Sequence, residues 1–314
     1  MDDGISKVAV VGTGQMGPTI ALVVALNGCE VTLVGRSAES LARGKAGFEG
    51  ALSFLVTNEA VAPEAAAAAR GRLAETTDQS AVADADLVVE CIVEHLPTKQ
   101  EIFRSLDELC PPEVILASNT SGLRITDIAA LMRRPERAVT THFWNPGHLM
   151  PLVEVIQGER TSEATIERTY GFLRRCGKQP VVGRKDVPGQ ICNRLFQAVI
   201  REAVYMVQEG IASAEGVETA IKAGMGLRFP VYGPLEHLDA VGLDLGLKVQ
   251  ATVLPGLCSS SEPAQLLKDL VARGNLGAST GQGFYDWRQR SVEELRRTRD
   301  LFLVERLKAG HNRG

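Results

Sequence analysis

The sequence predicts an α/β protein in which a doubly wound parallel sheet is followed by an all-helical domain. Short β-branched segments alternate with helical segments through the first part of the chain, a pattern typical of a parallel sheet with crossover helices. A charged break with proline and glycine follows at 184–189, and beyond it the apolar residues take the spacing of long helices. We therefore expect two domains, residues 1–185 and residues 186–314, the second ending in an extended helix.

Composition excludes several classes of function. The chain has 314 residues, of which 45% are hydrophobic and 23% charged, and its net charge of -4 gives no basic field for nucleic acid. No apolar run approaches the roughly 20 residues of a membrane span, and the start is acidic where a signal peptide would be basic, so we expect a cytoplasmic protein. The six cysteines are scattered without metal-ligand spacing, which favours reduced thiols and no metal site.

A glycine-rich turn stands near the start, between a predicted strand at 7–11 and an apolar helix at 20–26. A second strand is expected at 30–34. The pattern GxGxxG in this setting indicates the dinucleotide-binding Rossmann unit, because the glycines let the pyrophosphate approach the helix N-terminus. A glycine turn of some other α/β protein is the alternative. The expected cofactor-binding residues of this turn are Gly12, Gly14, Gln15, Met16 and Gly17.

The end of the second strand lacks the acid that an NAD-binding domain places on the adenine ribose. This chain has Gly35, Arg36 and Ser37 there. Glycine leaves room for a 2′-phosphate, the guanidinium can bind it, and the serine offers a hydroxyl. We therefore expect NADP as the preferred cofactor. NAD stays open, since Arg36 can also stack on adenine.

Two further segments of the first part follow. Residues 38–74 are alanine-rich and predict a helical hairpin broken at Asn58 and Pro63. A buried strand at 86–91 is followed by Glu94 and Lys99, at the end of a parallel strand where cofactors lie.

A strand at 114–117 leads into a polar turn that contains Ser121, which is either a helix N-cap or a ligand contact. His142 is followed twelve residues later by Glu154, across an Asn-Pro break. A strand, loop and strand would bring the two together as a catalytic pair, in which the carboxylate orients the imidazole that takes a hydroxyl proton. A satisfied histidine and a solvated glutamate are the alternative.

The second half predicts helices at 193–210, 215–224 and 262–273, with another starting at Pro234. The tail at 291–308 is rich in arginine and glutamate, and we expect it to be a solvated surface helix.

With these features in place, the chain resembles the 3-hydroxyacyl-CoA dehydrogenase superfamily from about Lys7 to Trp287. The blocks that carry the resemblance, besides the glycine turn, are Val89-Glu90-Cys91-Ile92-Val93-Glu94, Ser118-Asn119-Thr120-Ser121, His142-Phe143-Trp144-Asn145-Pro146, Leu152-Val153-Glu154-Val155, Asp186-Val187-Pro188-Gly189-Gln190-Ile191-Cys192-Asn193-Arg194, Gly233-Pro234-Leu235-Glu236 and Gly281-Gln282-Gly283-Phe284-Tyr285. Their order along the chain leaves little room for coincidence.

The resemblance implies a dehydrogenase that moves a hydride between NAD(P) and a CH–OH group. It implies that His142 is the general base and that Glu154 orients it. Ser121 and Asn193 match the family positions that hydrogen-bond the substrate oxygen.

Three more positions match family residues near the nicotinamide and its ribose: Asn145, Glu94 and Lys99. The family counterpart of the second half is an all-helical dimerisation domain, which implies a homodimer.

The substrate is left open between two classes. Pro151 stands where fatty-acid members of the family carry lysine, and the pattern Asn-Pro-x-x-x-x-Pro-Leu-Val-Glu resembles the branch with gulonate, carnitine and pyridine-carboxylate dehydrogenases. The long tail resembles that branch too. A small 3-hydroxy acid or related hydroxy compound is therefore expected, with an L-3-hydroxyacyl-CoA such as 3-hydroxybutyryl-CoA as the alternative. A non-catalytic dinucleotide-binding protein is a third possibility, disfavoured because the four site residues occur together.

Overall fold

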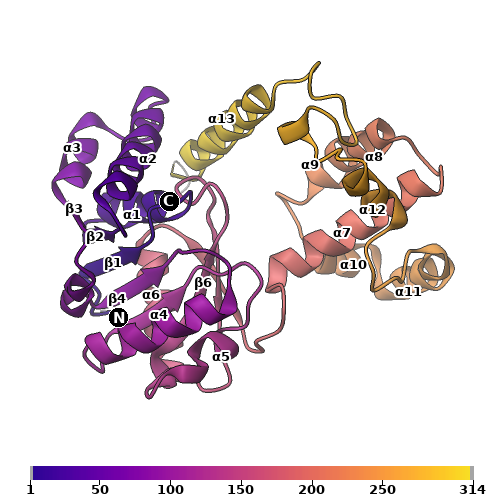
Figure 1. Cartoon of the computed structure of the whole chain (residues 1–314). Helices are drawn as coiled ribbons and strands as arrows, with labels where there is room; N and C mark the ends of the chain where they lie inside the picture. Colours follow the sequence, from indigo (N-terminus) through magenta and orange to yellow (C-terminus); the bar gives the residue numbers. More distant parts are fainter. Residues whose placement is uncertain (1–2, 312–314) are drawn as a thin grey trace. The chain divides into compact units, whose positions relative to one another are not determined.

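The computed structural model describes residues 3–311, so part of the acidic start and the last three residues lie outside it. Contacts divide the chain into two compact units (Figure 1): residues 3–193 with 297–311, and Arg194–Arg296. The sequence placed the boundary at 185/186 and the whole final helix in the second domain, whereas the contacts assign that helix from Arg297 onward to the first unit.

An eight-stranded sheet forms the centre of the first unit, in the order β3-β2-β1-β4-β5-β6-β7-β8. All neighbouring pairs are parallel except β6 and β7. The strands are β1 (Lys7–Val11), β2 (Glu30–Val34), β3 (Leu73–Thr76), β4 (Leu87–Glu90), β5 (Ile115–Ser118), β6 (Ala138–Phe143), β7 (Leu152–Ile156) and β8 (Gln179–Gly183). The strand order reverses between β1 and β4, the place where doubly wound sheets bind their ligands.

Helices cover both faces of this sheet. They are α1 (Gly17–Leu26), α2 (Ala38–Thr57), α3 (Pro63–Gly71), α4 (Leu96–Leu109), α5 (Ile125–Ile128), α6 (Glu163–Arg175) and the returning part of α13 (Val292–His311). Side chains alternate along β1, so that Val8 and Val10 join the core under α1, α2 and α6. Ala9 and Val11 join the opposite core, with Phe103 of α4.

The second unit is built from helices. They are α7 (Ile191–Gln208), which begins in the first unit, α8 (Ala214–Ala220) with its π-helical continuation Ile221–Met225, α9 (Gly226–Arg228), α10 (Pro234–Val241), α11 (Leu243–Val253) and α12 (Gln265–Ala272). Among residues 194–296, all of them described, only Val217 and Gly246 are buried. This unit therefore leaves most of its apolar surface uncovered within one chain.

The predicted fold class is confirmed, and several predicted elements coincide with the observed ones. The strands expected at 7–11 and 30–34 are β1 and β2, and the hairpin break falls between Thr57 and Pro63 as expected. Strand β3 was missed because its four residues, at the sheet edge, lack a β-branched apolar run. Helices α6 and α11 were not predicted either.

The tail was expected to be a solvated helix, and this prediction was wrong in part. Most of its described side chains are exposed, but Val304 is only 1% exposed and belongs to the core of the first unit. Leu303 and Leu307 pack against the same core. None of the helices in residues 3–311 is long and apolar enough to cross a membrane.

Candidate active site

The glycine turn joins β1 to α1 with the geometry that a bound pyrophosphate needs. Gly12 has φ of +119°, and a Cβ there would lie 2.6 Å from the Cys91 carbonyl oxygen. A Cβ on Gly17 would lie 1.9 Å from the Gly12 oxygen, so α1 can pack this closely only with glycine. Gly14 has nothing within 4 Å of its would-be Cβ and is exposed, which leaves its side of the turn open to a ligand.

A groove of about 780 Å³ starts at this turn and runs over the ends of β1, β2, β4 and β5. Residues of its wall are Val11, Gly12, Thr13, Gly14, Gln15, Met16, Val34, Gly35, Arg36, Ser40, Arg43, Gln79, Cys91, Ile92, Val93, Glu94, Ile102, Asn119 and Ser121. The groove therefore passes from the expected adenine end at Arg36 to the expected substrate end at Ser121, and the open backbone at its start fits a dinucleotide.

At the adenine end, Gly35 packs closely against the side chains at the start of α2. A Cβ on Gly35 would lie 2.8 Å from both Leu41 Cδ2 and Ser40 Oγ, so no carboxylate side chain fits there without movement. Arg36 is exposed on the groove wall. Ser37 caps α2 instead: its hydroxyl accepts a hydrogen bond from the Ser40 amide at 3.2 Å, and it is absent from the groove wall.

Behind the end of β4 lies a buried charge cluster. Lys99 is 1% exposed and donates to both oxygens of Glu90, at 2.7 and 2.9 Å, and it also lies 3.4 Å from Glu94. Glu90 is fully buried and accepts further bonds from the Ser118 hydroxyl and the Ile92 amide. The structure thus places Lys99 behind the groove wall, where it supports Glu94, rather than on the groove surface.

Glu94 reaches the groove and anchors the polar turn after β5. Its Oε1 accepts hydrogen bonds from the Thr120 hydroxyl and from the amides of Ser121 and Gly122. Burial opposes ionisation of Glu94, but the Thr120 bond and the Lys99 charge outweigh it and lower the pKa of the carboxyl. Ser121 does not cap a helix, since the next helix, α5, starts at Ile125 with Arg124 at its N-cap.

The antiparallel pair β6–β7 sets His142 directly opposite Glu154. His142 Nδ1 lies 2.7 Å from Glu154 Oε2, with the histidine 6% and the glutamate 0% exposed. Glu154 also accepts from the Trp144 indole at 2.9 Å and from the Cys192 amide at 2.7 Å. Burial opposes ionisation of Glu154, yet these bonds hold the pKa of the carboxyl below its usual value. With Nδ1 donating to a carboxylate, Nε2 is the nitrogen that can accept a proton.

The first turn of α7 closes the cluster. The Cys192 amide binds Glu154, and the next side chain, Asn193, donates from Nδ2 to the Ser121 carbonyl oxygen at 2.9 Å. The four predicted catalytic residues therefore lie in one hydrogen-bonded neighbourhood of the first unit.

Asn145 lies just after β6 and is exposed, on a loop with a cis bond to Pro146. Lys178 holds this loop by donating to the carbonyl oxygens of Gly147 and Met150, at 2.7 and 2.9 Å. A Cβ on Gly147 would lie 2.8 Å from Thr19 Oγ1, so the loop packs closely on α1.

Sequence reasoning missed Glu90, Asn119, Trp144 and the Cys192 amide as parts of this site. Asn119 Oδ1 accepts from the Phe143 amide at 2.9 Å and so fixes the end of β6. Trp144 and Asn119 stand inside the motif blocks, but their sequence positions do not reveal their partners.

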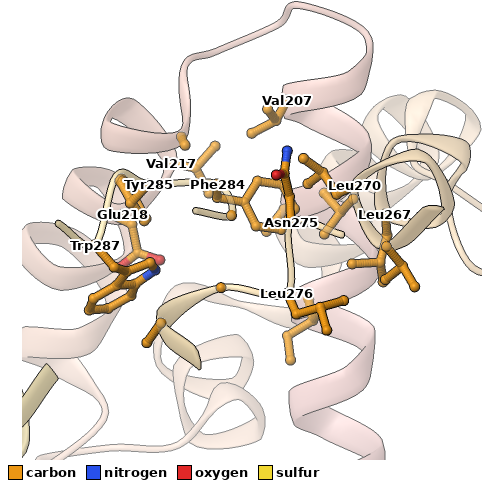
Figure 2. A pocket seen from close by; sticks show the side chains of 18 residues that line it. Val207, Val217, Glu218, Leu267, Leu270, Asn275, Leu276, Phe284, Tyr285 and Trp287 are labelled. Atoms are coloured by element: carbon orange, nitrogen blue, oxygen red, sulfur yellow. The ribbon is translucent and has the colours of Figure 1, made fainter. Parts of the chain in front are cut away.

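A second cavity, of about 560 Å³, lies wholly within the second unit. Figure 2 shows Glu218 and Trp287 on one side of it and Leu267 and Leu270 on the other. Its wall is largely apolar and comes from α7, α8, α12 and residues 275–287. It contains none of the predicted site residues.

Comparison with known proteins assigns both parts of the chain. Residues 7–187 match the family described as 3-hydroxyacyl-CoA dehydrogenase, NAD binding domain, and residues 189–287 match the corresponding C-terminal domain. A 3-hydroxybutyryl-CoA dehydrogenase of Bradyrhizobium diazoefficiens is 41% identical over 285 residues, covering 90% of this chain and 96% of the relative.

Another relative covers nearly the whole chain. It is the 5-formyl-3-hydroxy-2-methylpyridine 4-carboxylate 5-dehydrogenase of Mesorhizobium japonicum, 32% identical over 98% of this chain and 99% of its own length. A crystal structure of such an enzyme, described as an NAD⁺-dependent dismutase, has a TM-score of 0.88, 31% identity and coverage of 96% of this chain and 97% of that one. The (S)-3-hydroxybutyryl-CoA dehydrogenase of Ralstonia eutropha has a TM-score of 0.76 and 34% identity, over 90% of this chain and 99% of that one.

The glycine turn, the groove and these relatives agree on a nicotinamide dinucleotide as the cofactor of a dehydrogenase that acts on a CH–OH group. The chain belongs to the 3-hydroxyacyl-CoA dehydrogenase family.

Proposed function

We propose that this enzyme oxidises or reduces a small free hydroxy compound, a 3-hydroxy acid or related alcohol, rather than a CoA thioester. The observation that carries the proposal is the charge of the helical hairpin at 38–74, which contains as many acidic as basic residues. Every basic residue in it has a partner: Arg43 pairs with Glu39, Lys45 with Glu75, Arg70 with Glu49, and Arg72 donates to the Ala25 carbonyl oxygen. CoA carries several phosphate charges and calls for clustered cations, whereas the four basic residues of the hairpin are dispersed among as many acidic ones.

The extent of the similarity supports the same proposal. The pyridine-carboxylate dehydrogenase matches 98% of this chain, which includes most of α13, whereas the Bradyrhizobium 3-hydroxybutyryl-CoA dehydrogenase matches 90%. An L-3-hydroxyacyl-CoA remains the second candidate, and the 41% identity to that 3-hydroxybutyryl-CoA dehydrogenase favours it.

In the proposed mechanism, His142 Nε2 takes the hydroxyl proton during oxidation and returns it during reduction. The bound nicotinamide supplies the hydride acceptor or donor. Glu154 holds the imidazole by its Nδ1 and stabilises the imidazolium that forms. The Ser121 hydroxyl and the Asn193 side-chain amide hold the substrate oxygen. The hydrogen bond from Asn193 Nδ2 to the Ser121 carbonyl oxygen keeps the two residues side by side. Glu94 and Asn145 bind near the nicotinamide ribose, and Lys99 acts through Glu94.

We also propose NADP as the preferred cofactor. Support comes from Gly35, which stands where the ribose-binding acid would be and where an added Cβ would require Leu41 or Ser40 to shift, and from the exposed Arg36 beside it. Arg43 lines the same groove, where its guanidinium is paired with Glu39 at 2.6 Å. NAD is the alternative, favoured by the NAD⁺-dependent structure with the TM-score of 0.88.

A homodimer formed through the second unit is the last part of the proposal, with a second copy of this chain as the occupant of its apolar surface. Most of the exposed large hydrophobic side chains in residues 3–311 lie between 194 and 296, among them Leu235, Leu243 and Leu247 at 64–76% exposure. Patches of this kind on a soluble chain mark association surfaces.

The substrate class is tested by comparing turnover of acetoacetyl-CoA with that of acetoacetate and related free 3-oxo acids, each with NADPH and NADH. The proposal expects the free acids to be reduced with the higher kcat/KM. Efficient turnover of acetoacetyl-CoA alone would overturn it in favour of the second candidate.

His142→Gln should lower kcat by about 10²–10⁴-fold, because the variant loses the general base. Cofactor affinity, measured by fluorescence titration, should stay close to wild type. His237→Gln in the second unit is the matched control and should change neither quantity. An active His142→Gln enzyme would show that the base lies elsewhere.

Arg36→Ala should weaken NADPH binding by about 10-fold or more, since a hydrogen bond to a charged group contributes roughly 1.5–3 kcal/mol. NADH binding should be largely spared. Arg133→Ala, an exposed arginine outside the groove, is the control. Equal losses for the two cofactors would instead indicate stacking of Arg36 on adenine.

Analytical ultracentrifugation should give a species of about twice the 33.7 kDa chain mass. Leu243→Glu with Leu247→Glu, one helical turn apart on α11, should shift it toward the monomer, while Leu131→Glu in the first unit should not. A monomeric wild-type chain at micromolar concentration would rule the dimer out.

A further inference from the structure

The Glu154 carboxylate accepts a hydrogen bond from the side chain of Trp144 as well as from His142. Oε2 accepts two hydrogen bonds, from His142 Nδ1 at 2.7 Å and from Trp144 Nε1 at 2.9 Å, while Oε1 accepts the Cys192 amide at 2.7 Å. The Trp144 ring also lies beside the imidazole, with ring centroids 5.8 Å apart. Imidazole and indole therefore share one oxygen of a carboxylate that is fully buried.

The two donors differ in what they do during the reaction. The indole N–H only donates, and it stays the same whether or not the imidazole is charged. The imidazole becomes an imidazolium when it takes the substrate proton, and it then draws more strongly on the charge of Oε2. Charge that the indole neutralises on this oxygen is not available to stabilise the imidazolium.

We propose that Trp144 is a positioning residue that aims Glu154 Oε2 at His142 and, by sharing that oxygen, sets the pH at which the His142–Glu154 pair takes up its proton. The inference rests on the proposed role of His142 as the base. In oxidation the substrate O–H bond breaks and its proton goes to His142 Nε2, while the C–H bond of the carbon that bears the hydroxyl breaks and its hydride goes to the cofactor. Without the indole N–H, the imidazolium is better stabilised and forms at higher pH.

Cys192 and Val181, which neighbour Glu154 on α7 and β8, bring no charge to its carboxylate. From α7 comes Cys192, whose thiol has its pKa raised by burial and by the Glu154 charge, so that it adds no charge at neutral pH. From β8 comes Val181, the register partner of Glu154, which has no titratable group. His142 is the titratable group that β6 contributes to the contact.

The test is an NMR titration of the histidine side chains in the full-length protein, without substrate. His142→Gln identifies the His142 signal among the five histidines. In Trp144→Phe, the pH midpoint of that signal should rise by about half a unit to one unit, because a hydrogen bond to the charged carboxylate has been lost. Trp287→Phe, the same change at the other tryptophan, should leave the midpoint in place. An unmoved midpoint in Trp144→Phe overturns the proposal.

A second variant guards against misfolding of Trp144→Phe. In the Trp287→Phe background, replacement of the remaining tryptophan by benzothienylalanine keeps the ring shape but removes the N–H, and the midpoint should rise in the same way. If Trp144 acted only through the packing of its ring, the midpoint in the benzothienylalanine variant would stay unchanged, whatever the thermal stability of that variant.

Rate profiles separate this inference from the proposed function. Oxidation needs the neutral imidazole and reduction needs the imidazolium. With any substrate that is turned over, the acid limb of the oxidation rate profile and the alkaline limb of the reduction rate profile should therefore both move to higher pH in Trp144→Phe. If His142→Gln retains activity, the base assignment fails, whereas the NMR midpoint still reports on Trp144. If His142→Gln is inactive and the midpoint does not move, only the role of Trp144 fails.

Discussion

The hydrogen bond between His142 and Glu154 depends on the antiparallel pairing of β6 with β7, in a sheet whose other neighbouring strands are parallel. In an antiparallel pair, directly opposite residues point to the same face, and a slip of one residue would send one of them to the other face. The loop at 144–151 sets this register, and Lys178 ties that loop through two carbonyl oxygens. The site thus follows from strand pairing more than from any single side chain.

The groove wall is stiffened by charges that are buried and paired. Glu90 and Lys99 are each 0–1% exposed, and Glu90 accepts further hydrogen bonds from the Ser118 hydroxyl and the Ile92 amide. Taking such groups out of water is costly, and removing one partner of a buried pair typically costs about 3–5 kcal/mol. The pair places Lys99 3.4 Å from Glu94, whose carboxylate in turn holds the Ser121 and Gly122 amides of the turn after β5.

The two units divide the work. The first unit holds every residue of the proposed chemistry, up to Asn193 at the start of α7, and it also takes in the end of α13 through Val304. The second unit buries almost nothing within one chain and exposes large hydrophobic residues along its helices. The proposed chemistry thus lies on the sheet of the first unit, and the uncovered apolar side chains of the second unit are the basis of the proposed dimer.

Local sequence determined the parts of the protein that local physics controls. Strands β1 and β2, the glycine turn, the break between α2 and α3 and the fold class follow from β-branched runs, glycine spacing and proline positions, which act within a few residues. The pairing of His142 with Glu154 could also be anticipated, because both stand in one short strand, loop and strand segment, and the motif blocks bring Ser121 and Asn193 to the same site.

Only the tertiary structure decided which partners several of these residues take. Lys99 turns inward to Glu90, Trp144 shares an oxygen of Glu154, the Cys192 amide reaches the same carboxylate, and Val304 returns to the first core. The contacts of Cys192 and Val304 join elements far apart in the chain. The contacts of Lys99 and Trp144 join nearby elements, but they depend on how a side chain packs at the end of a strand, which the spacing of residues does not reveal.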